Sequence, residues 1–216
     1  MKNLLYKELK LVIPPATYLF ALLPALLLIP AYPYFVGVSY FFFIIQITFA
    51  TARANKDHEF TSMLPIPRRQ IVLAKHLNVA FVELLTILVA IPFALISSLI
   101  INPNGNIVGM DANFAFFGLT LIAYSVFNLA FFPAYFKTGY KMGVPLLIGI
   151  AVYLITICFF ELVINLVPTL KSTLDGLNPQ TFIYQFIVLA AGIVIYVGSM
   201  FVSYKISTKK FEKVSL

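Results

Sequence analysis

Two carboxylates stand inside long apolar segments of this chain. Glu83 lies about two helical turns into the segment that begins at Leu77, and Glu161 lies late in the segment 143–167, followed by Asn165. A charged group in lipid is costly and is a candidate functional site. Glu83, Glu161 and Asn165 could therefore line a polar translocation path or a gate. The alternative is a hydrogen bond that packs helices together, or a carboxylate at the membrane interface.

The remaining chemistry is sparse. Glu83 and Glu161 are expected at opposite depths of the membrane, so they do not form an acid/base pair. The sequence holds no GxxxxGK[ST], HExxH or GxSxG motif, which excludes an ATP site of the P-loop type and the usual hydrolase sites. His58 and His76 are expected to be solvated at the membrane surface, and the lone cysteine has no partner for a disulfide or a metal site. We therefore predict no catalytic residue and no metal site.

The most informative polar segment is 53–75, in which charges of both signs are mixed. Asn55 can cap a short helix whose first turn holds Asp57 and Glu59, which is favourable to the helix dipole. An apolar edge then follows at three-to-four-residue spacing, made of Phe60, Met63 and Leu64.

Pro65 and Pro67 end this short helix before the basic pair Arg68 and Arg69. An amphipathic helix held between two membrane spans would suit the docking of a cytoplasmic partner. The residues alone leave a second interpretation equally open, namely a solvated connector.

The composition explains why these polar residues are so few. Hydrophobic residues make up 61% of the 216 residues, charged residues only 11%, and the mean hydropathy is +0.97. Soluble domains contain about 25% charged residues. A soluble fold of this size has too little interior for so many apolar side chains, so we predict an α-helical membrane protein.

Charge-free stretches predict the membrane spans. The 42 residues from Leu11 to Ala52 carry no charge, which is enough for two crossings, and Pro30 and Pro33 separate them. A turn signal at 102–106 ends the third span. We predict one transmembrane domain, residues 1–216, with six spans near 13–30, 34–52, 77–101, 112–133, 143–167 and 182–204.

The distribution of basic residues predicts the orientation. Fourteen of the 15 Lys and Arg residues fall on one side of these six spans, and Lys171 alone falls on the other. The positive-inside rule places the basic side, with both termini, in the cytoplasm. The net charge of +7 therefore indicates contact with a membrane surface, and we expect no nucleic-acid partner.

The first ten residues are too polar to enter the membrane. Leu4, Leu5 and Leu9 alternate with lysines, a pattern that suits a short interfacial helix which would brace the first span. A frayed basic terminus is the equally open alternative.

Two stretches resemble one known family. The run Ser62-Met63-Leu64-Pro65-Ile66-Pro67-Arg68-Arg69-Gln70-Ile71-Val72-Leu73-Ala74-Lys75 is similar to a signature of small ABC-2 type transporter permeases. A shorter run, Phe132-Pro133-Ala134-Tyr135-Phe136-Lys137-Thr138-Gly139-Tyr140-Lys141, resembles the stretch that follows their fourth span. The sequence departs from the usual pattern at 67–69, where Ser-Arg-Lys is commoner, and before Lys141, where an acidic residue is common.

The resemblance implies a bacterial plasma-membrane exporter built from two permease subunits, as a homodimer or a heterodimer, with two separate ATPase subunits below. ATP and Mg²⁺ would bind to the ATPase subunits, and this chain would bind no cofactor and be no enzyme. The cargo would be a peptide, an antimicrobial compound or another amphipathic molecule. The alternative function is a six-span sensor or scaffold without transport.

By the same resemblance, the helix between spans two and three is a coupling helix that fits a groove on the ATPase. Arg68 and Arg69 would brace its junction with span three. The residues implied in ATPase coupling are Asp57, Glu59, Phe60, Met63, Leu64, Pro65, Arg68 and Arg69.

Overall fold

The computed structural model describes residues 2–103, 105–176 and 179–214, and of Lys2, Leu11, Ala16, His58 and Ser62 it describes the backbone alone. Every regular element in these ranges is a helix. In chain order they are α1 Lys2–Tyr6, the π-helix η1 Lys7–Val12, the 3₁₀ helix η2 Pro15–Leu28, α2 Tyr34–Ser39, α3 Phe41–Ala54, α4 Asp57–Met63, α5 Arg68–Ile96, the π-helix η3 Ser97–Ile101, α6 Phe114–Lys137, α7 Gly143–Leu166, α8 Pro168–Leu174, the 3₁₀ turn η4 Pro179–Thr181 and α9 Phe182–Phe211.

Five helices among the described residues are long and apolar enough to cross a membrane, namely Tyr34–Ala54, Arg68–Ile101, Phe114–Lys137, Gly143–Leu166 and Pro179–Phe211. Each of them overlaps one of the predicted spans, from the second to the sixth. The largest difference is in α5, which begins at Arg68 and not near Leu77, because most side chains of residues 71–79 are buried by neighbouring helices and continue the helix toward the basic residues.

The predicted span 13–30 contains the shorter helix η2. Pro24 stands in its middle and lacks the backbone N–H that an α-helix needs at that position. A 3₁₀ helix rises about 2.0 Å per residue, against 1.5 Å for an α-helix. Fourteen residues of η2 therefore extend about 28 Å, close to the thickness of about 30 Å of a hydrocarbon core.

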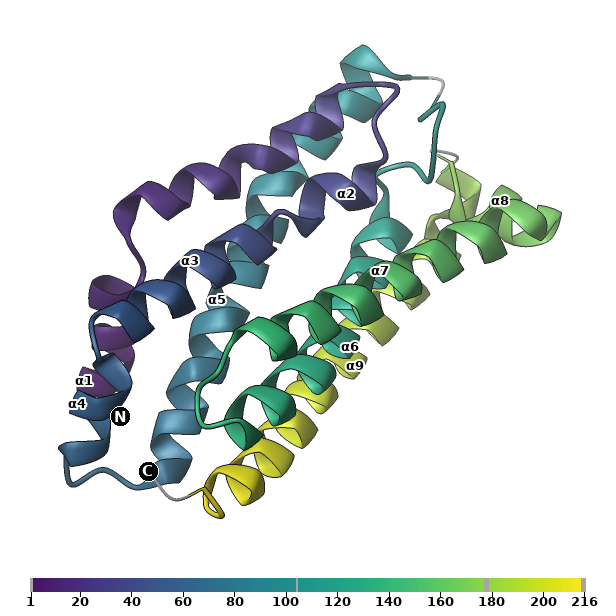
Figure 1. The fold of residues 1–216 in the computed structure, drawn as a ribbon. Coiled ribbons are helices and arrows are strands. Elements are labelled where there is room, and N and C mark those ends of the chain that lie inside the picture. The colour runs from purple at the N-terminus through teal and green to yellow at the C-terminus, as the bar shows by residue number, and fades with distance from the viewer. Residues whose placement is uncertain (1, 104, 177–178, 215–216) are drawn as a thin grey trace.

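The helices form two half-bundles (Figure 1). In the N-terminal half, η2 packs against α5, α2 and α3, and in the C-terminal half α6 packs against α9 and α7. Aromatic side chains fill the space between the halves. The ring of Phe41 contacts those of Tyr124 and Tyr153, and the ring of Phe49 contacts that of Tyr135.

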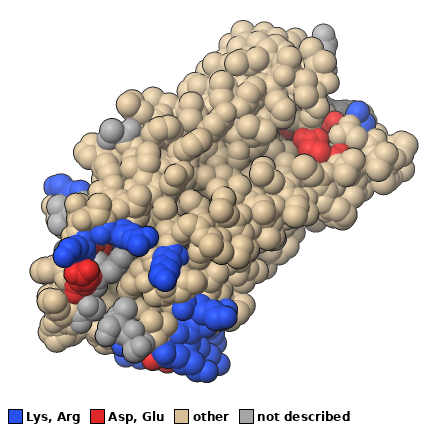
Figure 2. Space-filling model, viewed as in Figure 1, with Lys and Arg blue, Asp and Glu red and all other residues tan. Residues whose placement is uncertain are grey.

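The molecule has two chemically different ends. α1, α4 and the C-terminal end of α9 lie together at one end, which also holds both chain termini and which we call the basic end (Figure 1). Lys and Arg side chains gather there, and a smaller acidic patch lies toward the other end (Figure 2). That other end, formed by α8 and residues 102–113, is called the distal end.

The α6–α9 contact depends on two glycines. A Cβ atom on Gly118 would lie 2.6 Å from the carbonyl oxygen of Val188, and one on Gly192 would lie 2.8 Å from the Cα of Gly118. Small residues let membrane helices approach closely without a hydrophobic driving force between them. The same face of α9 continues toward the basic end with the buried residues Ser199, Ser203 and Ser207.

Candidate functional site

Helix α4 presents an exposed apolar surface at the basic end. Its side chains Phe60 and Met63 are 60% and 82% exposed. Pro65 and Glu59 are also exposed, whereas Leu64 is half-buried. The helix is short because Lys56 precedes it in a left-handed conformation and Leu64, in front of Pro65, follows it as extended backbone. We call Glu59, Phe60 and Met63 the α4 surface.

The prediction that Asn55 caps this helix is wrong. The N-cap position is Lys56, at φ 53°, and no described side chain makes a capping hydrogen bond there. Asn55 instead ends α3, and its backbone N–H bonds to the carbonyl of Thr51. The side chain of His58 lies outside the described part of the structure.

The opposite face of α4 is tied to the rest of the protein by a buried group of charges. Nζ of Lys7 lies 2.7 Å from one carboxylate oxygen of Asp57, and Nζ of Lys75 lies 3.4 Å from the other. Lys75 also lies 2.7 Å from Glu8, and Lys7 lies 3.2 Å from Glu8. We call Lys7, Glu8, Asp57 and Lys75 the four-charge cluster.

The cluster is balanced, with two positive and two negative groups, and Lys75 and Glu8 are almost fully buried. Buried charges are tolerated only when they are paired and hydrogen-bonded. Two further hydrogen bonds support these pairs, from Lys7 to Thr61 Oγ1 and from Asn78 to the Glu8 carbonyl. Helices η1, α4 and α5 are therefore joined at one point.

Arg68 binds the chain's own C-terminal region. Its Nη1 donates hydrogen bonds to the carbonyls of Phe211, Glu212 and Val214, at 2.9, 3.2 and 2.8 Å. Its guanidinium also lies over the Phe211 ring, 5.4 Å from the centroid. Arg69, the next residue, is exposed. The first residue of α5 is thus fixed to the end of α9.

The second motif, residues 132–141, packs around the same point. Phe211 is fully buried, and its ring contacts those of Phe136 and Tyr140. Gly139 and Tyr140 both have positive φ, 60° and 69°, which turns the chain sharply after α6. A bulky residue rarely adopts this conformation. The turn places the Tyr140 ring against Phe211.

A polar seam crosses the middle of the protein between the two half-bundles. The carboxylate of Glu83 on α5 is fully buried and accepts hydrogen bonds at 3.0 Å from Asn128 on α6 and at 2.7 Å from the Tyr196 hydroxyl on α9. Ser203 of α9 donates to the Asn128 carbonyl at 2.9 Å. Three helices are therefore connected through one carboxylate.

His76 belongs to the same seam, and the prediction of a solvated His76 is wrong. Its side chain is buried, its Nε2 lies 3.2 Å from Ser203 Oγ, and its ring stacks on Phe132 at 3.7 Å. The prediction failed because α5 extends two turns beyond the apolar segment, so His76 faces α6 and α9 and not water.

Glu161 and Asn165 lie far from Glu83, at the distal end. Glu161 is half-buried and accepts a hydrogen bond from the Met110 N–H at 3.3 Å. Asn165 bonds to the carboxylate and carbonyl of Glu161 and accepts from Lys171 Nζ at 3.1 Å. Asn165 and Lys171 line a cavity of about 500 Å³ beside residues 105–109.

Asp111 organises the neighbouring loop. Its carboxylate accepts from the N–H of Asn106, and its own N–H donates to Asp175 at 2.9 Å. Burial raises the pKa of Asp111 above its ordinary value, and the negative charge of Asp175 raises it further, while the hydrogen bond from Asn106 opposes the shift. Gly105 takes φ 91° beside this carboxylate, a conformation for which glycine is suited. Asn104 lies outside the described residues.

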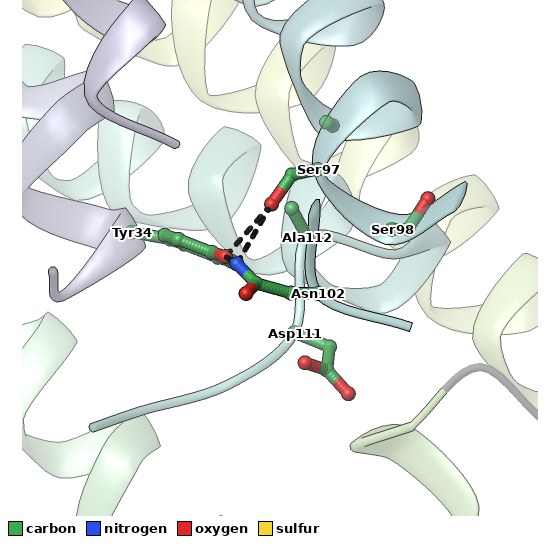
Figure 3. Close-up of a pocket in the computed structure, with 7 residues that line it drawn as sticks. Tyr34, Ser97, Ser98, Asn102, Asp111 and Ala112 are labelled. Atoms are coloured by element: carbon green, nitrogen blue, oxygen red, sulfur yellow. Dashed lines mark hydrogen bonds between the residues drawn. The ribbon is translucent and has the colours of Figure 1, made fainter. Parts of the chain in front are cut away.

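A small polar pocket closes the distal end of the N-terminal half. Tyr34, Ser97 and Asn102 point toward one another from α2, η3 and the segment that follows it (Figure 3). The Tyr34 and Ser97 hydroxyls are 2.9 Å apart, and Asn102 Nδ2 donates to the Tyr34 hydroxyl at 3.1 Å. The contacts among them are structural, because they connect the ends of two spans.

A family model described as ABC-2 family transporter protein matches residues 3–212, which is nearly the whole chain. The chain belongs to the ABC-2 transporter family. No curated protein and no solved structure matches it. Permeases of this family are membrane transport components that are not themselves catalytic, and they work with ABC ATPase partners. This ABC-2 protein is thus a multi-pass membrane protein with a role in transport.

The structure separates the residues predicted for ATPase coupling in this ABC-2 protein into three groups. Glu59, Phe60, Met63, Pro65 and Arg69 are exposed at the basic end. Asp57 faces the four-charge cluster, and Arg68 faces the end of α9. Leu64 is half-buried between them.

Sequence reasoning missed most of the partners in this site. No sequence pattern pairs Lys7, Glu8 or Lys75 with the residues that contact them. None points to Asn128 or Tyr196 as a partner of Glu83. The spacing of Glu8 and Lys75, 67 residues apart, gives no local signal. Asn128 could have been noticed as a polar residue within an apolar segment.

Proposed function

We propose that this chain is the permease subunit of an ATP-binding cassette exporter, and that α4 is the helix through which a separate ATPase subunit moves it. The observation that carries this proposal is the α4 surface, in which Phe60 and Met63 are exposed while Asp57 on the other face is held by Lys7 and Lys75. Exposed apolar side chains on a firmly held helix are suited to a protein partner.

The four-charge cluster supports transmission of movement from α4. A displacement of α4 would carry η1 with it through Lys7, and α5 through Lys75. Asp57 then acts as a positioning residue that holds the α4 surface in place. Arg68 would extend the same connection to α9, and Arg69 remains for contact with the partner or with phosphate groups.

We infer that the polar seam is where the half-bundles separate during transport. Glu83 connects α5 to α6 and α9 at this seam, and aromatic rings fill much of the remaining space between the halves. Glu83 would then act as a gate near the middle of the membrane, and Glu161 and Asn165 would lie at the distal mouth of the path. Rigid movement of one half against the other gives alternating access.

The proposed topology has six spans, with both termini, α1 and α4 in the cytoplasm. We count η2 as the first span because its length of about 28 Å is close to the thickness of a hydrocarbon core. The gathering of Lys and Arg at the basic end supports the orientation. Two permease chains would pair, each with an ATPase subunit that binds ATP and Mg²⁺, in a bacterial plasma membrane. The cargo would be a peptide, an antimicrobial or another amphipathic compound.

The topology is tested by cysteine labelling on a Cys158→Ser background. Asn106→Cys should react with an impermeant maleimide added to intact cells, whereas Lys56→Cys should react only after permeabilisation. The reverse pattern would overturn the orientation, and labelling of both positions from outside would overturn the span count.

The coupling role is tested by co-expression with the ATPase encoded nearest to this chain's gene. Replacing Phe60 and Met63 together by Ala should reduce co-purification and reduce transport-linked ATP hydrolysis at least several-fold. The matched control replaces Ile107 and Val108, which are 80% and 53% exposed at the distal end, and should leave both unchanged. Stable membrane insertion without any ATPase or transport would favour the sensor or scaffold.

A further inference from the structure

An apolar groove of about 540 Å³ lies on the distal side of the polar seam. One wall is formed by Ile91 and Leu95 on α5 and by Leu99 on the following η3. The other wall is formed by the first turns of α6 and α9, with Phe117 and Leu189. The groove begins at Ile87, one turn beyond Glu83, and reaches Pro103 and Asn113 at the distal end. Its lining residues are therefore distinct from the hydrogen-bonded residues of the seam.

The dimensions of the groove fit one hydrocarbon chain. Ile87 on α5 and Leu99 on η3 are twelve residues apart, which corresponds to about 18 Å along a helix. Half of a bilayer's hydrocarbon core measures about 15 Å. The volume lies in the range of 300–1,000 Å³ that is typical of small-molecule sites.

The groove opens sideways out of the bundle. Leu95 on α5 and Leu99 on η3 are 55% and 75% exposed, and both belong to the apolar helix Arg68–Ile101, which is long enough to cross a membrane. An occupant can therefore enter from the membrane without crossing the protein, and it is already in the leaflet that lies beside the groove.

The polar groups of the groove gather at its distal end. They are Ser98, Asn113 and Gln185. The Ser98 hydroxyl donates to the Leu95 carbonyl, and the side-chain Oδ1 of Asn113 accepts from the Phe116 N–H and caps α6, so both are satisfied within the protein. Gln185 is fully buried in the groove wall, and its Nε2 donates to the Gly176 carbonyl at 3.0 Å. Its Oε1 has no hydrogen-bond partner among the described residues.

A buried carbonyl oxygen without a donor is costly, and a ligand that donates a hydrogen bond removes the cost. We propose that this groove binds a membrane amphiphile with a single hydrocarbon chain and a hydroxyl head, the chain lying between α5 and α6 and the hydroxyl donating to Gln185 Oε1. The proposal stands whether or not α4 binds an ATPase.

The chain contains no tryptophan, so one introduced indole reports on its own surroundings. Leu95→Trp places it in the groove. Ile96→Trp is the matched control, because Ile96 is the adjacent residue of α5, is 40% exposed and does not line the groove. Each variant is reconstituted in nanodiscs of unbrominated phosphatidylcholine and titrated with 12-bromododecan-1-ol or with its methyl ether, which has no hydroxyl donor.

Quenching at Leu95→Trp should saturate, and unbrominated dodecanol should reverse it, while quenching at Ile96→Trp should rise in proportion to the probe. The alcohol should half-saturate at about a fivefold lower mole fraction than the ether, the ratio expected for one hydrogen bond of ordinary strength. Adding Gln185→Leu to the Leu95→Trp chain should abolish that difference. Because the ether needs no acceptor, its unchanged binding shows that this variant is folded.

Proportional quenching at both positions, with no competition, would show that the groove holds only exchanging bulk lipid and would overturn the proposal. Saturable quenching with equal affinity for alcohol and ether would overturn the assignment of Gln185 as the acceptor. If the Gln185→Leu chain no longer binds the ether, that variant is misfolded and gives no information. The difference in affinity between alcohol and ether in the Leu95→Trp chain then decides the proposal.

Discussion

Nζ of Lys75 lies 2.7 Å from a carboxylate oxygen of Glu8, and both side chains are shielded from solvent although 67 residues separate them in the chain. This pair joins the N-terminal helical segment to the long helix α5. Asp57, on α4, contacts Lys75 and so belongs to the same cluster. Helix α4, which would receive a partner's movement, is therefore connected to η1 and α5 by ion pairs.

Replacing Lys75 by Met should destabilise the protein by about 3–5 kcal/mol, because it leaves the buried carboxylate of Glu8 and the half-buried carboxylate of Asp57 with one cation between them. The double variant with Glu8→Gln restores a balanced pair, Lys7 and Asp57, and should be more stable than Lys75→Met alone. Reversible unfolding in mixed micelles measures both. Lys56→Ala, at an exposed pair 3.9 Å apart, is the control and should change little.

The Tyr196→Phe variant should lose about 1–3 kcal/mol of stability, since it removes one hydrogen bond to the buried Glu83 carboxylate. Ser199→Ala, one turn away, removes a hydroxyl that donates to a carbonyl of its own helix and should cost less than about 0.5 kcal/mol. The unfolding free energies are to be compared in one detergent. Equal costs for the two variants would show that the seam does not hold the half-bundles together.

Two glycines of α9 should respond in opposite ways to alanine. A Cβ on Gly192 meets the backbone of Gly118, so Gly192→Ala must separate α6 from α9 and should cost about 1–3 kcal/mol. A Cβ atom on Gly198 would meet no other part of the described structure within 4 Å, and Gly198→Ala should stabilise α9 by up to about 1 kcal/mol. Thermal unfolding distinguishes them, and a lower melting temperature for Gly198→Ala would contradict this account of α6–α9 packing.

Stability should depend on pH through Asp111. Its pKa is raised above the ordinary value of 3.8, so the folded state favours the protonated form. The corresponding stability is present at low pH and is lost as the pH rises through the raised pKa. Asp111→Asn keeps an acceptor for Asn106 without the charge. It should therefore unfold at a higher temperature than wild type at pH 8, with little difference at pH 4.

The same pH series with Glu212→Gln serves as the control, because Glu212 is exposed at the basic end. The prediction is contradicted if the wild-type protein gains stability relative to Asp111→Asn when the pH rises from 4 to 8.

Much of the fold could be predicted because membrane spans are local features of sequence. An uncharged stretch of about 20 residues must form a helix in lipid, and the spans 34–52 and 143–167 differ by only a few residues from Tyr34–Ala54 and Gly143–Leu166. The type of helix in segment 13–30 was harder to predict. Its prolines limit an α-helix, and composition alone does not distinguish α from 3₁₀ geometry.

The site was less predictable, because its contacts join residues far apart in the chain. The sequence predicted a short helix after residue 55 with Phe60 and Met63 on one edge, and the structure confirms that helix. It could not show that Asp57 would face Lys7, nor that Arg68 would bind the end of α9. Those contacts depend on how η1 and α9 pack beside α5, which no short-range pattern encodes.

The central claim, that α4 receives an ATPase subunit, is tested most directly by the reactivity of position 63. Met63→Cys on a Cys158→Ser background, in inside-out vesicles, should react rapidly with an impermeant maleimide, because Met63 is 82% exposed. Adding the purified ATPase subunit should slow that reaction at least tenfold, while Lys205→Cys, exposed on α9, should keep its rate. An unchanged rate at position 63 while the ATPase is bound to the vesicles would contradict the account.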